Sequence, residues 1–434
     1  MNTAAPVKSA KAETLRLPEH RDAFYGGEWH KPKSGKYVDS INPGTGESLG
    51  PFADCGADDI DAAVQAAKKA FDGWRNTPPL ERARVLKRIA AVLRENADEL
   101  AMIDAADCGN PVRAPLATGN VVIMKPPEQA PLSSLRLAEL IGGLLPPGVF
   151  NIVPGGREAG SALTTHPGVA MIALIGSVPT GRAVMKAAAD TLKPVMLELG
   201  GKNALIAYPD ADPDEVAGGV VGGMNFTWCG QSCGSTSRAF VHEKIYDAVL
   251  AKVKTKIAHF KPGIATDRST TMGAIISKSQ YERILGFIDS AKQEGARLLT
   301  GGGRPSDPAL AKGFFIEPTV FADVQPNMRI AREEIFGPVL SVFKWSDEVK
   351  MLEEVNAVEY GLTASIWTND LSTAHRTAGA VQAGFVWINE VSKHFLGAPF
   401  GGYKQSGIGR EECFEEMLAY TQEKNIHVKL RPAK

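Results

Sequence analysis

Residues 120–199 alternate short apolar runs with amphipathic segments, starting at "NVVIM" (120–124). The other apolar runs are "VFNIV" at 149–153, "VAMIALIG" at 169–176 and "PVMLEL" at 194–199. Helical patterns separate these runs at 131–143, 156–165 and 179–191. Strands that read as nearly continuous apolar runs and alternate with helices are typical of βαβ units, with a parallel sheet covered on both faces. The stretch therefore predicts a doubly wound, nucleotide-binding type of domain.

A second series of elements follows this stretch. Its patterns predict strand "SRAFVH" at 237–242, helices at 243–258 and 277–293, and strands near 297–300, 339–344, 362–367 and 384–388. Helical patterns also precede the first series, between about 58 and 104. Because 434 residues exceed the size at which one core stops growing, we expect a second α/β domain in this part of the chain.

Composition and charge exclude several classes of function. Apolar residues make up 44% of the chain and charged residues 22%, which is ordinary for a globular protein. Lys and Arg number 48 against 49 Asp and Glu, so no broad basic face can follow a nucleic acid backbone. No apolar run is long enough to cross a bilayer. We expect neither nucleic acid nor membrane as a partner, and small-molecule chemistry instead.

The five cysteines indicate a reducing compartment. They stand at 55, 108, 229, 233 and 413, and an odd number scattered over a long chain is not a disulfide framework. We therefore expect a cytoplasmic protein. A metal site at Cys229 and Cys233 is disfavoured because two ligands without a neighbouring Cys or His do not complete a tetrahedral set. The ordinary interpretation of a free cysteine, a small buried hydrophobe, is kept for Cys55, Cys108, Cys229 and Cys413.

Cys233 is the candidate nucleophile. The helix before it begins well, with Asp212 as N-cap and Pro213 in the first turn, but its body "VAGGVVGGMNF" carries four glycines. Such a helix implies close packing against a neighbour. We expect Gly230 to end the helix and Cys233 to lie on the loop beyond, where a thiol can meet a substrate.

Glu198 is the candidate general base. It ends the apolar run "VMLEL" and precedes the pair Gly200 and Gly201. A glutamate in this position is usually a helix cap or a surface charge. Beside a nucleophilic thiol, however, a carboxyl whose pKa is raised by apolar walls can act as a base.

These residues, together with others, resemble the NAD(P)-dependent aldehyde dehydrogenases. "LELGGKN" at 197–203 and "FTWCGQSC" at 226–233 are similar to the glutamate and cysteine signatures of that family, at the expected separation. Four more segments match in order: "VVIMKPPEQAP" at 121–131, "GSVPTG" at 176–181, "EEIFGPV" at 333–339 and "PFGGYKQSGIGRE" at 399–411. Six segments in order over nearly the whole chain make the resemblance specific.

The resemblance implies both an architecture and a reaction. The α/β fold would comprise a Rossmann-like NAD-binding domain at 1–199, a catalytic domain at 200–405, and a return segment with an oligomerisation strand at 406–434. Cys233 would attack an aldehyde carbonyl to give a thiohemiacetal, and hydride transfer to NAD would leave a thioester. Glu198 would then activate water, releasing a carboxylic acid. The sequence shows no source of thiolate activation, so we expect the cationic nicotinamide and backbone N–H groups to supply it.

The resemblance also implies a set of cofactor residues. Lys125 would reach the adenosine ribose or a phosphate, and Glu128 would accept hydrogen bonds from ribose hydroxyls. Gly176 and Ser177 would meet the pyrophosphate at a helix N-terminus, and the nicotinamide ribose would be positioned by Glu334 and Phe336. Because a carboxylate at 128 repels a 2′-phosphate, NAD is favoured over NADP. The alternative for each position is a surface charge or a core side chain.

The chain departs from the family pattern at one place. Several dozen residues are missing between Val112 and Arg113, including a helix, a hairpin used in oligomer contacts, and a segment whose asparagine donates to the oxyanion. Asn110 and Asn120 flank the junction, but neither sits in the expected motif, so the role passes to no residue. The first strand and helix of the nucleotide fold are lost as well. A catalytically impaired relative, acting as a binding or structural protein, is therefore the alternative hypothesis.

Two further expectations concern partners. Candidates for a substrate tunnel, with core packing as the alternative, are Phe226, Trp228, His394, Phe395 and Phe400. Their character favours an aldehyde with an uncharged body. The tail "YTQEKNIHVKL" alternates like a partner-seeking strand, and in the family such a tail pairs with a neighbouring subunit, so we expect a homodimer or homotetramer.

Overall fold

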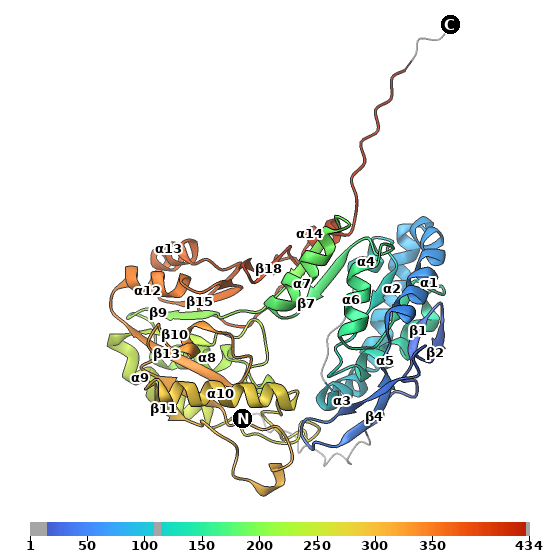
Figure 1. The fold of residues 1–434 in the computed structure, drawn as a ribbon. Helices are drawn as coiled ribbons and strands as arrows, with labels where there is room; N and C mark the ends of the chain where they lie inside the picture. Colours follow the sequence, from blue (N-terminus) through green and yellow to red (C-terminus); the bar gives the residue numbers. More distant parts are fainter. Residues whose placement is uncertain (1–14, 108–113, 431–434) are drawn as a thin grey trace, which may run out of the picture.

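The computed structural model describes residues 15–107 and 114–430. The predicted junction between Val112 and Arg113, and with it Cys108 and Asn110, lies outside the described residues. Figure 1 shows two α/β halves side by side, with the C-terminal segment extending away from the body.

The larger half is built on one seven-stranded sheet, in the order β11-β12-β13-β10-β9-β15-β16. All neighbours in this sheet are parallel except β11 and β12. Its strands are β9 Ala204–Ala207, β10 Arg238–His242, β11 Arg297–Thr300, β12 Thr319–Ala322, β13 Val339–Trp345, β15 Thr363–Trp367 and β16 Phe385–Ile388. The helices of this half are α8 Pro213–Gly223, α9 Glu243–Ile257, α10 Lys278–Gln293, the short α11 Arg329–Arg332, α12 Glu348–Asn356 and α13 Leu371–Ala380 (Figure 1).

The smaller half contains a sheet in two pieces. One piece has the order β2-β1-β6-β5, and the other has the order β18-β8-β7. The strands are β1 Ala23–Tyr25, β2 Glu28–His30, β5 Val122–Met124, β6 Phe150–Ile152, β7 Ile172–Ile175, β8 Val195–Glu198 and β18 Gly407–Ile408. The predicted βαβ pairs are confirmed, since β5 with β6 and β7 with β8 are parallel. The division between β5 and β7 agrees with the loss of a strand that the sequence resemblance implied.

Helices hold the two pieces of sheet together on one side. α6 (Arg157–Thr165) joins β6 to β7, α7 (Val178–Ala189) joins β7 to β8, and the two helices pack against each other. The buried Lys193 ammonium donates to the carbonyl oxygens of Thr164 at 2.9 Å and His166 at 2.7 Å. The remaining helices of this half are α1 Ala57–Asn76, α2 Pro79–Glu95, α3 Ala97–Asp107, α4 Ala114–Ala117 and α5 Leu132–Ile141.

Two sequence expectations about local structure were wrong. The helix before Cys233, α8, ends at Gly223 rather than at Gly230. Asn225 takes a left-handed conformation at φ 55°, which terminates the helix and starts a short 3-10 turn at Phe226–Trp228. Cys413 is only partly buried, as the N-cap of α14 (Phe414–Ala419), whereas Cys55 and Cys229 are buried as expected.

The adjacent glycines Gly218 and Gly219 of α8 provide a matched test of helix packing. A Cβ at Gly219 would lie 2.2 Å from Cζ2 of Trp367, whose indole N–H donates to Ser365 Oγ at 2.8 Å, whereas a Cβ at Gly218 meets nothing within 4 Å. We expect Gly219→Ala to lower the free energy of unfolding by about 1–3 kcal/mol through overpacking. Gly218→Ala should raise it by about 0.5–1 kcal/mol through helix propensity. Urea unfolding measures both, and equal effects would contradict the packing argument.

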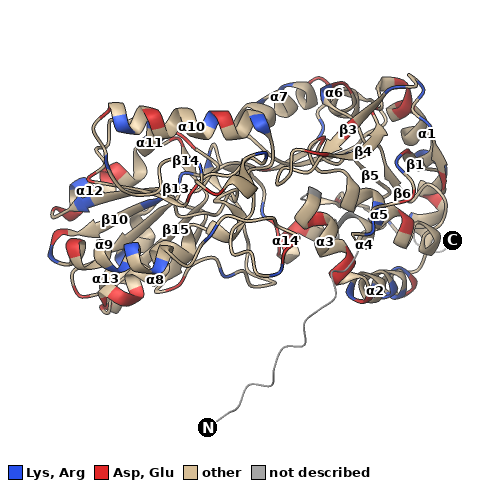
Figure 2. Ribbon diagram, turned by 90° about the horizontal axis from the view of Figure 1, so that it is seen from below, with Lys and Arg blue, Asp and Glu red and all other residues tan. Residues whose placement is uncertain are grey.

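The surface carries mixed charges. Figure 2 shows Lys and Arg interspersed with Asp and Glu on the outer helices of both halves, which fits the net charge of -1. Among the helices in 15–107 and 114–430, none combines the length and apolar character that a membrane span requires.

Candidate active site

Glu198 is the last residue of β8 in the smaller half. β18 pairs antiparallel with β8, placing Gly407 opposite Glu198. A Cβ at Gly407 would lie 2.0 Å from the carbonyl oxygen of Leu197, so only glycine allows this approach. On the other side, the Gly176 N–H donates to the carbonyl oxygen of Glu198 at 3.0 Å. The glutamate is therefore held by backbone pairing on both sides.

The loop that carries Cys233 is anchored by Asn203, a residue that the sequence analysis did not single out. The buried Asn203 amide donates to the carbonyl oxygens of Cys233 at 2.6 Å and Ser235 at 3.0 Å. Its Oδ1 accepts from the Thr363 N–H at 3.0 Å. Asn203 lies five residues after Glu198 in "LELGGKN", so the only available signal was its place in that segment.

The Cys233 thiol and the Glu198 carboxyl lie close enough for each to shift the pKa of the other. Burial raises the pKa of Glu198 to about 7, with Glu411 and Glu334 adding to the rise and the thiol opposing it. Burial, followed by the negative charge of Glu198, raises the pKa of the Cys233 thiol, and only the Gly234 N–H acts to lower it. The Oε1 atom of Glu198 is buried without a hydrogen-bond partner in the described part of the chain. Such an oxygen is placed to accept a hydrogen bond from a molecule that enters the site.

Glu334 is, with Glu198 and Glu411, the third carboxylate near the Cys233 thiol. Its Oε1 accepts from the Gly201 N–H at 2.9 Å, and a Cβ at Gly200 would lie 2.2 Å from its Oε2. The negative charge of Glu334 contributes to the raised pKa of both Glu198 and Cys233. Phe336 lies two residues further on, 37% exposed and in a left-handed conformation at φ 53°.

The other predicted cofactor residues form two separate groups. Lys125, just after β5, is half-buried and donates to the carbonyl oxygens of Pro126 at 2.7 Å and Gly155 at 2.8 Å. Burial lowers the pKa of Lys125, while the nearby Glu128 acts to raise it. Ser177 caps α7 and accepts from the Thr180 N–H at 3.4 Å. Among the described residues, no hydrogen bond or ion pair joins the group at β5 to the group at β7.

The aromatic tunnel candidates do not form one cluster. Phe226 is fully buried in the core of the larger half, which agrees with the core-packing alternative for this residue. The rings of His394 and Phe400 lie 4.7 Å apart and are tilted by 43° to each other, close to the return segment that carries β18. Trp228 and Phe395 are 63% and 60% exposed.

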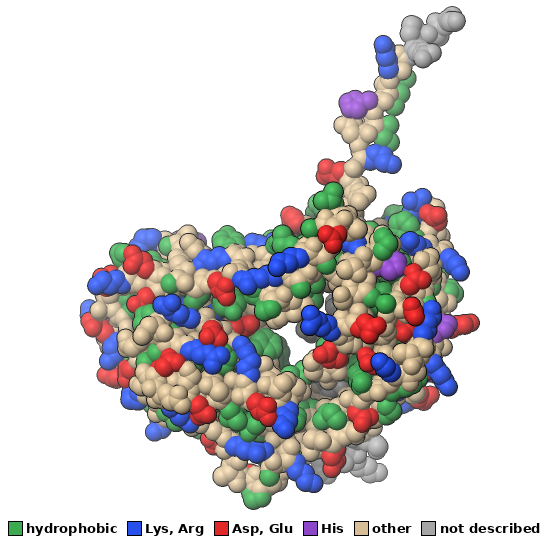
Figure 3. Space-filling view, viewed as in Figure 1, with side chains coloured by type: hydrophobic (Ala, Val, Ile, Leu, Met, Phe, Trp, Pro, Cys, Tyr) green, Lys and Arg blue, Asp and Glu red, His purple; other side chains and the backbone are tan. Residues whose placement is uncertain are grey.

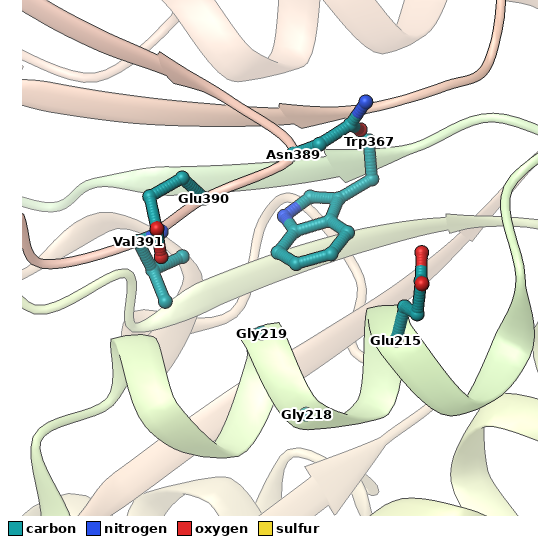
Figure 4. Close-up of a pocket in the computed structure, with 7 residues that line it drawn as sticks. All are labelled: Glu215, Gly218, Gly219, Trp367, Asn389, Glu390 and Val391. Carbon is teal, nitrogen blue, oxygen red and sulfur yellow. The ribbon is translucent and has the colours of Figure 1, made fainter.

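An open pocket of about 530 Å³ lies elsewhere in the larger half (Figure 4). It is lined by Glu215, Gly218, Gly219, Trp367, Asn389, Glu390 and Val391. None of the predicted site residues is among them, so this pocket is distinct from the thiol and carboxyl pair. In 15–107 and 114–430, no group of three His, Cys, Asp or Glu side chains could hold a metal ion.

A partly buried thiol near a buried carboxyl of raised pKa, in a two-part α/β fold, is an arrangement suited to cysteine-dependent catalysis. The chain belongs to the aldehyde dehydrogenase family: the family model matches residues 29–114 and 112–426. The two matched stretches meet at 112–114, the position of the predicted junction.

Individual relatives agree with this assignment. The chain is 47% identical to aldehyde dehydrogenase tropH of Talaromyces stipitatus, covering 95% of this chain and 94% of the relative. It is 37% identical to a betaine aldehyde dehydrogenase of Sinorhizobium fredii, with 93% and 96% covered. The first alignment spans 485 positions and this chain has 434 residues, so at least 51 aligned positions have no counterpart here.

Solved structures match the fold closely. An indole-3-acetaldehyde dehydrogenase mutant from P. syringae, solved with NAD+ and IAA, superposes with a TM-score of 0.92 at 32% identity, covering 96% of this chain and 98% of the other. An aldehyde dehydrogenase from Bacillus cereus, solved with NAD+, gives 0.90 at 34% identity, covering 95% and 97%. The predicted fold class is confirmed by these matches.

Proposed function

We propose that this protein oxidises an aldehyde to a carboxylic acid with NAD, using Cys233 as nucleophile and Glu198 as general base. The observation that carries the proposal is the proximity of the Cys233 thiol to the buried Glu198 carboxyl, each of which shifts the pKa of the other. A base with a pKa near neutrality can both accept a proton from the thiol and return one later.

The first half of the reaction builds a covalent intermediate on the sulfur. Glu198 accepts the thiol proton, and the Cys233 sulfur attacks the aldehyde carbon to form a thiohemiacetal. Loss of hydride from that carbon leaves a thioester on Cys233. The Gly234 N–H, which lowers the pKa of the thiol, is a backbone donor beside the reacting sulfur.

The second half of the reaction requires water. Glu198 accepts a proton from a water molecule, whose oxygen attacks the thioester carbon and releases the carboxylic acid and the thiol. The buried and unpartnered Oε1 of Glu198 supports this role, because it can orient that water. The raised pKa of Glu198 makes the carboxyl basic enough for the transfer near neutral pH.

The residues at the end of β7 and the start of α7 fit a dinucleotide. The first turn of α7 is exposed at Gly176, Ser177 and Thr180, at the carboxyl end of the parallel strand β7, where a diphosphate binds in such folds. The exposed Glu128 carboxylate can accept from ribose hydroxyls and disfavours a 2′-phosphate. Lys125, Glu334 and Phe336 complete the proposed binding set. Bound NAD supplies the hydride acceptor.

The decisive test is NADH formation. The purified chain is mixed with NAD and a panel of aliphatic and aromatic aldehydes, and NADH absorbance is followed. The proposal expects turnover with at least one aldehyde that has an uncharged body. No signal above Cys233→Ser would reject it, and hydrolysis of an activated ester by the same protein would then show whether the thiol alone still acts.

The pKa of Glu198 sets an expected pH dependence. The carboxylate is the active form of Glu198, whose pKa is about 7. Activity is therefore low at pH values below this pKa and rises as the pH increases through it. Between one pH unit below and one above this value, the steady-state rate should rise about ten-fold. A pH series of kcat, with Glu198→Gln as the matched variant, measures the effect. A wild-type profile that is flat over this range would contradict the assigned base.

A second candidate function rests on the divided sheet. The gap between β5 and β7 lies among the proposed cofactor residues, which favours a catalytically impaired relative that acts as a binding or structural protein. NAD binding without turnover, measured by calorimetry, would support this candidate. A cytoplasmic location and assembly as a homodimer or homotetramer remain predictions, and light scattering of the purified chain measures the latter.

A further inference from the structure

An imidazole on the loop after β16 is held by a carboxylate of the return segment. His394 Nδ1 lies 3.1 Å from both carboxylate oxygens of Glu412. Because a carboxylate only accepts hydrogen bonds, Nδ1 carries the proton of this contact. The other ring nitrogen, Nε2, has no hydrogen-bond partner in the described part of the chain, and the His394 side chain is 42% exposed. A neutral imidazole fixed in this way offers one free acceptor, Nε2.

Backbone contacts hold both partners in place. The Gly397 N–H donates to the carbonyl oxygen of Glu412 at 2.7 Å, and the Trp387 indole N–H donates to the carbonyl oxygen of Lys393 at 2.8 Å. Glu412 itself has a left-handed conformation at φ 62°, which a glutamate adopts only where its surroundings impose it. The His394 ring and the Glu412 carboxylate are therefore set against each other by the fold around them.

The return segment places this pair near the candidate active site. Gly407 lies opposite Glu198 in the pairing of β18 with β8, and the five residues from Gly407 to Glu412 span at most roughly 18 Å. Glu411, just before Glu412, exchanges backbone hydrogen bonds of 2.7 and 2.9 Å with Phe400, and its negative charge reaches Glu198. The space-filling view shows an opening between the two halves, and β18 and α14 lie above it in the same view (Figures 1 and 3).

The side chains around His394 are aromatic and apolar. The Phe400 ring centre is 4.7 Å from that of the imidazole, and the Phe385 ring lies at 6.0 Å, tilted by only 16° to it. The next two residues, Phe395 and Leu396, are 60% and 91% exposed. Exposed apolar side chains beside a fixed imidazole favour a ligand with a flat apolar body, which can stack on the rings and cover them.

The charges around this imidazole decide which polar group the ligand carries. Glu416 accepts from the Glu412 N–H at 2.7 Å, and the charges of both residues act on Glu411, so three carboxylates lie together. The neighbouring cations are Lys393 and Arg410, and the Arg410 guanidinium already donates to backbone carbonyl oxygens. The balance is negative and repels an anion, while the apolar neighbours disfavour a full charge of either sign. An uncharged hydroxyl group can donate to the free acceptor.

We propose that His394, positioned by Glu412, accepts a hydrogen bond at Nε2 from a hydroxyl group of the substrate, and that the substrate is an aromatic aldehyde carrying that hydroxyl. This inference rests on the proposed oxidation at Cys233 and adds the substrate class to it. Glu412 is a positioning residue, because it fixes the imidazole tautomer that leaves Nε2 as an acceptor. Phe395 and Leu396 cover the aromatic ring.

Matched substrates test the hydrogen bond. The panel contains 3-hydroxybenzaldehyde and 4-(hydroxymethyl)benzaldehyde, whose hydroxyl groups stay protonated at neutral pH, and the methyl ether of each, which cannot donate. At least one hydroxy aldehyde should exceed its ether in kcat/KM by roughly 3- to 10-fold, mainly through KM, as one neutral hydrogen bond provides. Equal values, or higher values for both ethers, would overturn the proposal.

Three further aldehydes test the class of substrate. The proposal expects lower kcat/KM with 4-carboxybenzaldehyde, with 4-(trimethylammonio)benzaldehyde and with 6-hydroxyhexanal than with the better hydroxy aldehyde of the first panel. A higher value for either charged compound would overturn the assignment of an uncharged group. A higher value for 6-hydroxyhexanal would overturn the assignment of an aromatic body.

Substitutions assign the preference to this pair. His394→Phe keeps a ring against Phe400 but removes both nitrogens, so the ratio of kcat/KM for the hydroxy aldehyde to that for its ether should fall to about 1. Glu412→Ala releases Nδ1 and should lower the ratio at least two-fold. Lys393→Ala, a change at an exposed side chain of the same loop, should retain it. If His394→Phe lowers kcat/KM for both aldehydes alike and keeps the ratio, its role is structural and the proposal is wrong.

Binding without turnover separates this inference from the proposed function. Calorimetry of full-length Cys233→Ser with NAD gives Kd for the better hydroxy aldehyde and its ether, and the same difference of roughly 3- to 10-fold is expected. The double variant with His394→Phe should lose it. Should the wild-type chain oxidise no aldehyde, the proposed function fails, yet this difference in Kd would still support the assigned hydroxyl site. Equal Kd values for the two compounds would overturn it.

Discussion

Replacement of Cys233 by serine is expected to abolish aldehyde oxidation, lowering kcat/KM by roughly 10⁴-fold or more. A serine hydroxyl is a far weaker nucleophile than a thiol, and the carboxyl beside it has a pKa of only about 7. Steady-state NADH formation at saturating NAD measures the loss. Retention of more than one hundredth of the activity would contradict the assigned nucleophile.

Cys229→Ser is the matched control, four residues away. Cys229 is 1% exposed, and its thiol donates to the carbonyl oxygen of Ala274 at 3.5 Å, a contact that a serine hydroxyl can also make. We expect this variant to retain activity within a few-fold, with equal circular dichroism spectra for both variants. If Cys229→Ser were the inactive one, the roles of the two cysteines would have to be exchanged.

Glu198→Gln should separate the two halves of the reaction. The amide cannot accept a proton from water, so the thioester accumulates, and steady-state turnover should fall by about 10²–10⁴-fold. A burst of NADH approaching one equivalent per chain should precede this slow phase if thiol attack needs the carboxylate less than hydrolysis does. Stopped-flow absorbance records both phases.

Glu353→Gln, an exposed carboxylate on α12, controls for loss of a single charge. It should leave burst and steady state unchanged. Loss of both phases in Glu198→Gln would show that the carboxylate is needed for thiol attack as well. Unchanged hydrolysis in this variant would remove Glu198 from the mechanism.

The regular spacing of apolar residues along the sequence explains which parts of the fold could be predicted. The apolar runs that became β5 to β8 and β10 were bounded by turn residues and helical patterns, and their types were correct. β9 and β12 were missed because four-residue strands next to glycine or proline carry little pattern of their own. The end of α8 was placed too late, at Gly230, because the apolar pattern continues past Gly223, whereas Asn225 already makes the turn.

The candidate site could be predicted only where a residue type carries chemistry. Cys233 and Glu198 stood out because a thiol and a carboxyl in these segments suggest catalysis. Asn203 did not, because an amide that anchors a loop through two carbonyl oxygens has no sequence pattern. The division of the sheet between β5 and β7 follows from the loss of a strand that the resemblance implied. How the two pieces are then arranged in space could not be predicted from the sequence.

The two glycines after Glu198 have a consequence for engineering this protein. The Gly201 N–H donates to the Glu334 carboxylate, and the same carboxylate fills the space where a side chain at Gly200 would lie. The loop after Glu198 and the segment around Glu334 therefore pack closely against each other. A side chain at position 200 would displace both at once. Substitutions meant to change thioester hydrolysis alone, or dinucleotide binding alone, should therefore leave Gly200, Gly201 and Glu334 unchanged and be made at other positions.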